Sequence, residues 1–150
     1  MSAFEEINNI WVDLFNEVME LEEKAIITDE FKDITNNDMH IIEAVGLGDG
    51  NNMSTIAQKL KVTPGSLTTS MNQLVQKNYV IRTRSHKDRR VVNISLTEKG
   101  ESAYYHHKEF HEQMTRAALS SLSEEEIRVL VRSLSSLTKF FKSYAKEPEK

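Results

Sequence analysis

The sequence of 150 residues contains no cysteine, only two prolines and only five glycines. The absence of cysteine excludes disulfides, thiolate metal sites and cysteine-based catalysis or redox sensing. Because proline and glycine are the residues that most often interrupt helices, their scarcity favours a mostly helical chain. The sequence also lacks a run of about 18 apolar residues and the basic start of a secretory signal. We therefore expect a cytoplasmic protein without a membrane segment.

The sequence motifs of common enzymes are missing as well. There is no nucleophile elbow, no glycine loop for cradling phosphates and no HExxH sequence. We expect the protein not to be an enzyme and to need no cofactor. An enzyme acting on acyl thioesters is kept as a remote alternative, since acidic and histidine side chains are present without a motif that positions them.

Positive charge is concentrated in the middle of an otherwise acidic chain. Between Met53 and Gly100 there are nine basic and two acidic residues, a net charge of +7, although the whole chain carries −4. The remainder of the chain therefore carries −11. This asymmetry indicates a polyanionic partner for the middle segment, but charge alone is equally compatible with a solvated basic surface.

Apolar residues recur at steps of three and four near both ends of the chain, which is the pattern of amphipathic helices. One helix is expected over residues 2–27, a long helix from Thr97, and a last helix after the capping-box sequence Ser123–Glu126. The end stripes are more apolar than a monomer surface, which favours a homodimer, although some of these residues could pack within one chain. The interface candidates are Trp11, Leu14, Phe15, Leu130, Leu134, Leu137 and Phe141.

The middle segment has the pattern of a helix-turn-helix. A capping-box sequence at Thr35–Asp38 opens one helix, a glycine-rich loop follows, and a short helix then leads into a tight turn. Thr63 can cap the next helix, whose first position is Pro64. The outer face of that helix is slim, polar and free of carboxylates, as a helix in the DNA major groove requires. The candidates for contacts with or near bases are Ser66, Thr68, Thr69, Asn72 and Gln73.

Two short strands, Tyr79–Thr83 and Val91–Leu96, flank the cationic stretch RSHKDRR and predict a basic hairpin. Arginine suits a narrow minor groove because its guanidinium is planar and weakly hydrated. The Asp88 carboxylate is expected to hold the Arg90 guanidinium through a charge-assisted hydrogen bond. The alternative is a solvated hairpin with scattered charges. The DNA-binding candidates of the hairpin are Arg82, Arg84, Lys87, Asp88, Arg89 and Arg90.

Together these elements predict a mainly α winged helix-turn-helix protein with a small β wing. Residues 35–100 would form the DNA-binding domain, and residues 1–34 and 101–150 a helical dimerisation region. The segment DRRVVNISLT at Asp88–Thr97 resembles the wing signature of MarR-type regulators, and the resemblance covers nearly the whole chain. It implies a dimeric transcriptional repressor that binds double-stranded DNA with an inverted-repeat operator. It also implies that Arg90 enters the minor groove.

A narrower resemblance is to the FabT-type branch of that family. It is carried by FKDITNNDMHIIEAVG, TPGSLTTSMNQLVQKNYVIRTRSHKDRRVV and HHKEFHEQM. This resemblance implies control of fatty-acid biosynthesis genes, with long-chain acyl-acyl carrier protein as corepressor. Adaptable methionine suits an acyl chain as well as it suits a core. The candidates for an acyl pocket are Ile27, Phe31, Met39, Ile42, Phe110 and Met114.

The five histidines leave a metal-responsive regulator as the rival hypothesis. His107 and His111 are four residues apart and would share one helix face, with Glu22, Glu23, Glu43 or Glu109 as possible oxygen donors. The alternative is that the histidines pack or form hydrogen bonds between helices without a metal. His40 and the HHKEFH stretch also fit the acyl-responsive type, which needs none.

Overall fold

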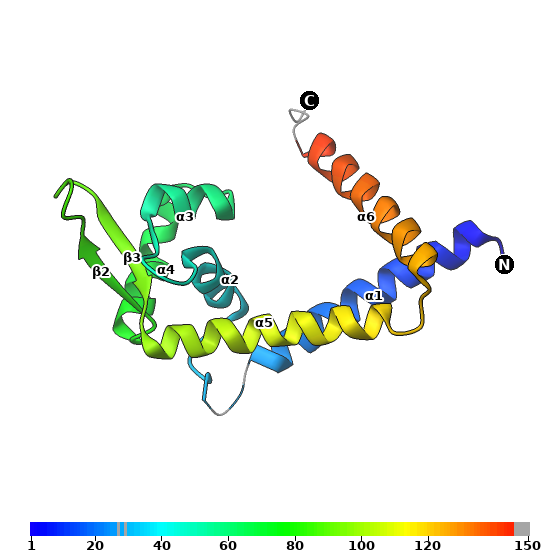
Figure 1. Ribbon diagram of the computed structural model, residues 1–150, viewed down its shortest axis with the longest axis horizontal. Coiled ribbons are helices and arrows are strands. Elements are labelled where there is room, and N and C mark those ends of the chain that lie inside the picture. Colours follow the sequence, from blue (N-terminus) through cyan, green and yellow to red (C-terminus); the bar gives the residue numbers. More distant parts are fainter. Residues whose placement is uncertain (27, 29, 146–150) are drawn as a thin grey trace. The chain divides into compact units, whose positions relative to one another are not determined.

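The structure is a computed structural model that describes residues 1–26, 28 and 30–145. It consists of two compact units, residues 1–110 and residues 111–150, which are treated separately below. The described residues form six α-helices and one three-stranded antiparallel sheet, so the expected mainly α fold with a small β wing is confirmed (Figure 1). The helices are α1 (Ala3–Ile26), α2 (Asn36–Val45), α3 (Met53–Leu60), α4 (Pro64–Gln76), α5 (Glu98–Leu119) and α6 (Glu124–Tyr144). The strands are β1 (Asn51–Asn52), β2 (Val80–Arg84) and β3 (Val92–Leu96).

The helix starts follow from side-chain caps that satisfy the free backbone N–H groups of the first turn. Thr35 and Asp38 form the expected capping box of α2, with both hydrogen bonds at 3.1 Å. Thr63 caps α4 by accepting a hydrogen bond from the Ser66 backbone N–H at 3.2 Å, and Pro64 occupies the first turn as expected. The segment after α2 was expected to be only a glycine-rich loop, but its last two residues, Asn51 and Asn52, form β1.

Strand β1 is short because Asn52 also begins the next helix. Its side chain accepts a hydrogen bond from the Thr55 backbone N–H at 2.8 Å and so caps α3. In the sheet, Asn51 lies opposite Ile94 and Asn52 opposite Asn93, so β3 is the central strand between β1 and β2. The sheet therefore ties the start of the helix-turn-helix to the hairpin that follows it.

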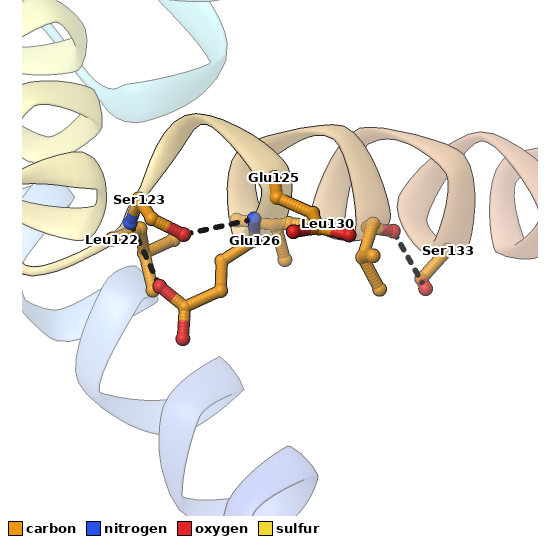
Figure 2. Close-up of a pocket in the computed structure, with 7 residues that line it drawn as sticks. Leu122, Ser123, Glu125, Glu126, Leu130 and Ser133 are labelled. Carbon is orange, nitrogen blue, oxygen red and sulfur yellow. Dashed lines mark hydrogen bonds between the residues drawn. The ribbon is translucent and has the colours of Figure 1, made fainter.

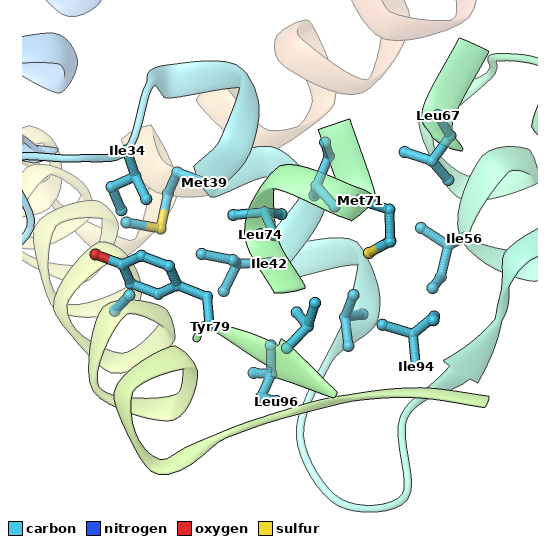
Figure 3. Close-up of a cluster of buried hydrophobic side chains, with 14 of the residues drawn as sticks. Ile34, Met39, Ile42, Ile56, Leu67, Met71, Leu74, Tyr79, Ile94 and Leu96 are labelled. Carbon is cyan, nitrogen blue, oxygen red and sulfur yellow. The ribbon is translucent and has the colours of Figure 1, made fainter. Parts of the chain in front are cut away.

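The core of the first unit lies between the helix-turn-helix and the sheet. Figure 3 shows side chains of α2, α4 and β3 converging on it, among them Met39, Ile42, Met71, Leu74 and Ile94, each of which has no exposed surface. The remaining members close the core on its sides: Phe31, Ile34, Ile41, Val45, Ile56, Ala57, Leu67, Tyr79, Val80, Leu96 and Ala103. Because these residues are packed inward, the opposite face of α4 is left for solvent or a partner.

The second unit, as far as it is described, contains the end of α5 and the whole of α6. Figure 2 shows the capping box of α6, which the sequence predicted: Ser123 Oγ accepts from the Glu126 backbone N–H, and the Glu126 carboxylate accepts from the Ser123 backbone N–H. No residue of α6 is buried, and Leu134 and Phe141 are about half exposed. No helix of the described residues combines the length and hydropathy needed to cross a membrane. The expected division into residues 35–100 and the two flanking segments stays a prediction.

Candidate nucleic-acid interface

The exposed face of α4 carries all five side chains that were expected to read DNA. Two of them are engaged within their own helix: Ser66 Oγ donates to the Thr63 carbonyl at 2.9 Å, and Thr68 Oγ1 donates to the Pro64 carbonyl at 3.0 Å. Thr69, Asn72 and Gln73 project from the following turns and are exposed. The first two hydroxyls keep acceptor capacity only, which leaves the later three residues as the more versatile hydrogen-bonding groups of this face.

The cationic side chains of the β2–β3 hairpin are exposed, and the backbone of the hairpin tip is held in place by its own side chains. The Ser85 backbone N–H, directly after β2, donates to the carbonyl of Val91, directly before β3, at 2.9 Å. Its hydroxyl also accepts from the backbone N–H groups of Lys87 at 3.3 Å and Asp88 at 3.5 Å. Ser85 was not among the expected site residues, although a serine at the start of a turn is a common signal for such bonds.

Asp88 acts on the backbone rather than on a guanidinium. Its Oδ1 accepts a hydrogen bond from the backbone N–H of Arg90 at 3.0 Å, and its carbonyl accepts from the Val91 N–H at 3.0 Å. The orientation expected for the Arg90 guanidinium is therefore replaced by a turn in which Asp88 fixes the main chain at Arg90. An aspartate two residues before its partner favours this turn because its short side chain reaches the N–H directly.

One contact joins the helix to the hairpin. The Arg82 guanidinium on β2 donates a hydrogen bond from Nη2 to Oδ1 of Asn72 on α4. Arg82 lies opposite Ile94 in the sheet, and Ile94 is fully buried, so this cation is placed on the sheet face that packs toward the helices. Both residues were expected at the interface, but the sequence did not indicate that they touch.

The apolar stripes expected at a dimer interface are exposed to a large extent in each unit. On α1, the rings of Trp11 and Phe15 stack with centroids 5.5 Å apart, while Leu14 and Phe15 are about half exposed. On α6, Leu130 and Leu137 are partly covered. Large exposed apolar surfaces of this kind mark contacts with another protein chain, so these residues keep their predicted role as dimer candidates.

The candidates for an acyl pocket are divided between different environments. Phe31, Met39 and Ile42 are buried in the core of the first unit. Phe110 is partly buried, and Met114, in the second unit, is 37% exposed. Ile27 lies outside the described residues. The pocket itself stays a prediction.

Histidines and glutamates meet on the inner side of α5 within the first unit. Nε2 of His107, a buried residue, lies 3.7 Å from Glu22 Oε1 and 3.4 Å from Glu43 Oε2. Nε2 of His40 lies 3.5 Å from the same Glu22 oxygen. Glu22 and Glu43 are two of the four carboxylates that the sequence offered as oxygen donors. His111 follows His107 by about one turn of α5.

Comparison with known proteins supports the reading of these elements. A family model described as "Transcriptional regulator SarA/Rot" matches residues 24–106, which is more than half of the chain. The transcriptional repressor MdtR of Bacillus subtilis is 36% identical over 75 residues, which are 50% of this chain and 48% of MdtR. The chain thus matches about half the length of that relative, and the regulator SarZ of Staphylococcus aureus is matched to a similar extent, with 33% identity over 47% of each chain.

Solved structures extend the likeness to nearly the whole chain. Streptococcus pneumoniae FabT, crystallised with DNA, is 38% identical, with a TM-score of 0.84 and coverage of 94% of this chain and 99% of FabT. S. aureus MepR, also crystallised with DNA, is 26% identical, with a TM-score of 0.64 and coverage of 89% and 97%. Together with the helix-turn-helix and the wing, these matches identify the chain as a member of the MarR family of winged-helix transcription regulators, of a type similar to FabT.

Proposed function

We propose that this protein is a dimeric transcriptional repressor that binds double-stranded DNA at an inverted-repeat operator in the cytoplasm. The observation that carries the proposal is the exposed polar face of α4 beside a cationic hairpin within one compact unit. A polar helix without carboxylates can enter the major groove, and the cations of the hairpin can lie along phosphates and a minor groove. FabT, which is similar over nearly the whole chain, was crystallised with DNA.

Selection of duplexes from a random pool by the purified full chain tests this function. Two copies of α4 related by a two-fold axis would read half-sites about one helical turn apart. The selected duplexes are expected to share an inverted repeat, and affinity is expected to fall steeply with salt because Lys and Arg displace counterions from phosphates. Recovery of no common sequence, or of a single asymmetric half-site, would contradict the proposal.

The regulated genes are those of fatty-acid biosynthesis, and the corepressor is a long-chain acyl group on acyl carrier protein. The likeness to FabT supports this assignment. Phe31, Met39 and Ile42 are candidates for contacts with an acyl chain, because they belong to the buried apolar cluster of the first unit. An acyl chain inserted there would gain about 0.8 kcal/mol for each buried methylene, so long chains would bind far more tightly than short ones.

Charge restricts where an acidic carrier protein can dock. Outside residues 53–100 the chain carries −11 and repels it, so the carrier needs a cationic surface within that segment. Lys59 and Lys61, at the end of α3, are the candidates outside the hairpin and α4. A DNA-binding titration with carrier bearing no acyl group, a short one or a long one tests the corepressor. Tighter DNA binding only with the long chain supports it, and equal effects of all three forms contradict it.

A zinc-responsive regulator is the second candidate, and the arrangement of histidines and glutamates favours it. Zinc bound at about 2.0–2.1 Å in a tetrahedral site holds its ligand atoms about 3.3 Å from one another. Three separations in the structure are close to that value: 3.5 Å between His40 and Glu22, 3.7 Å between His107 and Glu22, and 3.4 Å between His107 and Glu43. Imidazole and carboxylate are also ligands that zinc accepts. The same groups can pair without a metal when a histidine is protonated.

The two candidates separate in one experiment. The DNA-binding titration is repeated with zinc and with a chelator, in the absence of any acyl carrier, on the wild type and on His107→Ala. If zinc changes DNA binding by the wild type and has no effect on His107→Ala, the metal is the regulator. A response to long-chain carrier that is unchanged by the chelator would assign it to the acyl group.

A further inference from the structure

The hydrogen bond between Arg82 and Asn72 determines which end of the Asn72 amide on α4 can face a base. Asn72 Oδ1 accepts a hydrogen bond from the Arg82 guanidinium. A guanidinium carries five N–H donors and no acceptor, so it can only face the oxygen of a side-chain amide. The two ends of the Asn72 amide are therefore distinguished. Its oxygen is turned toward the hairpin, and its NH₂ group is left as the end that is available to a ligand.

An asparagine that is free to rotate has a different preference in DNA. It reads adenine by donating to N7 and accepting from N6, which uses both ends of the amide. In this protein one lone pair of the oxygen accepts from the Arg82 cation. That bond orients the amide and makes its oxygen a poorer acceptor for the neutral donor of a base. An NH₂ donor then favours base edges that present only acceptors in the major groove, guanine through N7 and O6 and thymine through O4. It is less suited to adenine, where the N6 donor lies beside the N7 acceptor, and unsuited to cytosine, which offers only the N4 donor.

We propose that Arg82 is a positioning residue for base readout, and that it makes Asn72 a donor that selects guanine or thymine rather than adenine or cytosine. The inference rests on the proposed function, since it concerns how the proposed DNA interface reads sequence. It assigns Arg82 a role beyond attraction to phosphate. The hairpin thereby contributes to specificity at a base pair that it does not itself contact.

Neighbouring residues provide matched controls for this assignment. Arg84 lies two residues further along β2, so its side chain is on the same face of the strand, and it is equally a cation. Its guanidinium donates to the Arg89 carbonyl at 3.4 Å instead of to α4. Removal of Arg84 thus removes the same charge from the same hairpin and leaves the Asn72 amide held. Arg82→Lys keeps the charge but loses the planar fork that meets the amide.

The experiment is a competitive selection with the full chain, in which every base pair of the selected operator is varied in turn. Asn72→Ala identifies the base pair whose preference depends on Asn72, and that preference is expected to be for guanine or thymine by about 5-fold or more, the low end for a base contact. Arg82→Ala and Arg82→Lys are expected to lose most of the same preference. Arg84→Ala is expected to weaken binding to all sequences alike and to retain the base preference that depends on Asn72.

A double substitution separates positioning from a direct contact. If Arg82 acts through Asn72, Asn72→Ala with Arg82→Lys should show no greater loss of preference than Asn72→Ala alone. Additive losses at different base pairs in the double variant would overturn the inference. A preference for adenine or cytosine at the base pair that depends on Asn72 would also overturn it, as would an unchanged preference in Arg82→Ala. Thermal unfolding of each variant shows whether a loss comes from unfolding. If the wild type selects no operator, the proposed function fails, and the inference fails with it.

Discussion

The hydroxyl of Tyr79 donates a hydrogen bond of 2.6 Å to the carboxylate of Asp33. Asp33 lies in the segment between α1 and α2, and Tyr79 lies where α4 meets β2, so one bond links segments 46 residues apart in sequence. Lys99 completes the arrangement, because its Nζ lies 4.4 Å from the centre of the Tyr79 ring and 3.6 Å from Asp33 Oδ2. The tyrosine side chain is buried among core residues (Figure 3). Its bond to Asp33 therefore links the base of the wing to the chain before α2.

Tyr79→Phe is expected to destabilise the protein by about 1 kcal/mol at neutral pH. The ring and its packing remain, whereas the bond to a charged acceptor is lost; the value is at the low end because the Asp33 side chain is 45% exposed and screened by water. Urea unfolding at pH 7 measures the difference. Equal stabilities of the two proteins would show that the bond does not contribute.

The same bond predicts a pH dependence. The hydrogen bond from Tyr79 and the charge of Lys99 hold the pKa of Asp33 below its usual range, despite some opposing burial. The folded state thus favours the ionised carboxylate, so its contribution is present above the unfolded pKa of about 3.9 and is lost as pH falls through the lower folded pKa. The stability difference between wild type and Tyr79→Phe should therefore narrow below about pH 4. A constant difference from pH 6 to 3 would contradict this.

Alkaline pH acts on the tyrosine itself. Burial, followed by the bond to Asp33, raises the pKa of Tyr79 well above its usual range. Because the unfolded chain ionises first, wild-type stability should decrease as pH rises above about 10, and Tyr79→Phe should be less sensitive. Urea unfolding at pH 9 and 10.5 checks this. If both proteins lose the same stability between pH 9 and 10.5, the loss comes from titratable groups other than Tyr79.

Two helical glycines give a matched pair for testing the packing at the base of the wing. A Cβ added at Gly100 would lie 2.0 Å from the Tyr79 carbonyl oxygen, whereas a Cβ added at Gly65 would meet nothing within 4 Å. Gly100→Ala is expected to cost about 3 kcal/mol or more because α5 must move away from Tyr79. Gly65→Ala is expected to be neutral or to stabilise by up to about 1 kcal/mol through helix propensity. Thermal unfolding measures both, and equal effects would contradict the close approach.

Asp88 offers a test of the wing turn in which charge and hydrogen bonding are separated. Asp88→Asn keeps an oxygen that can accept from the Arg90 N–H and removes a negative charge near DNA, so it is expected to bind DNA as tightly as the wild type or more tightly. Asp88→Ala also loses the acceptor and should bind more weakly than Asp88→Asn. Equilibrium DNA binding at two salt concentrations checks the order. Equal affinities of the two variants would show that the turn does not depend on the side chain.

Thr69 and Lys87 should differ in the kind of loss that they cause. Thr69, on the exposed face of α4, is expected to change the preferred site when replaced by alanine, whereas Lys87→Ala should weaken all sites alike. Arg90 is the residue predicted to enter the minor groove, and Arg90→Ala is expected to cost about 1–3 kcal/mol of DNA affinity. Binding to the selected operator and to random duplex DNA separates these effects. Parallel losses for Thr69→Ala and Lys87→Ala on both DNAs would contradict the distinction.

The helices and the wing could be predicted from the sequence because their signals are local. Thr35 and Asp38, Thr63 and Pro64, and Ser123 and Glu126 each place a cap within four residues of a helix start, and each begins a helix in the structure. The expected strand Val91–Leu96 is likewise present as β3, in which Ile94 and Leu96 are buried.

Contacts between distant segments were harder to predict. Strand β1 has only two residues, and it depends on pairing with Ile94 and Asn93 some 40 residues later. The Arg82–Asn72 bond depends on how the hairpin is placed beside α4, which no local pattern specifies. One local contact was also expected at the wrong group, since Asp88 binds the backbone N–H of Arg90 and not the Arg90 guanidinium. The sequence offered four candidate carboxylates, and only the folded structure shows that Glu22 and Glu43 lie near His107.

The most direct test of the central claim is a footprint of the full chain on the operator obtained by selection, combined with the mass of the protein–DNA complex in solution. The account predicts two copies of the chain on one duplex and protection of two half-sites related by a two-fold axis, about one helical turn apart. Binding of a single copy to one asymmetric half-site, or protection that is the same on any duplex, would contradict it.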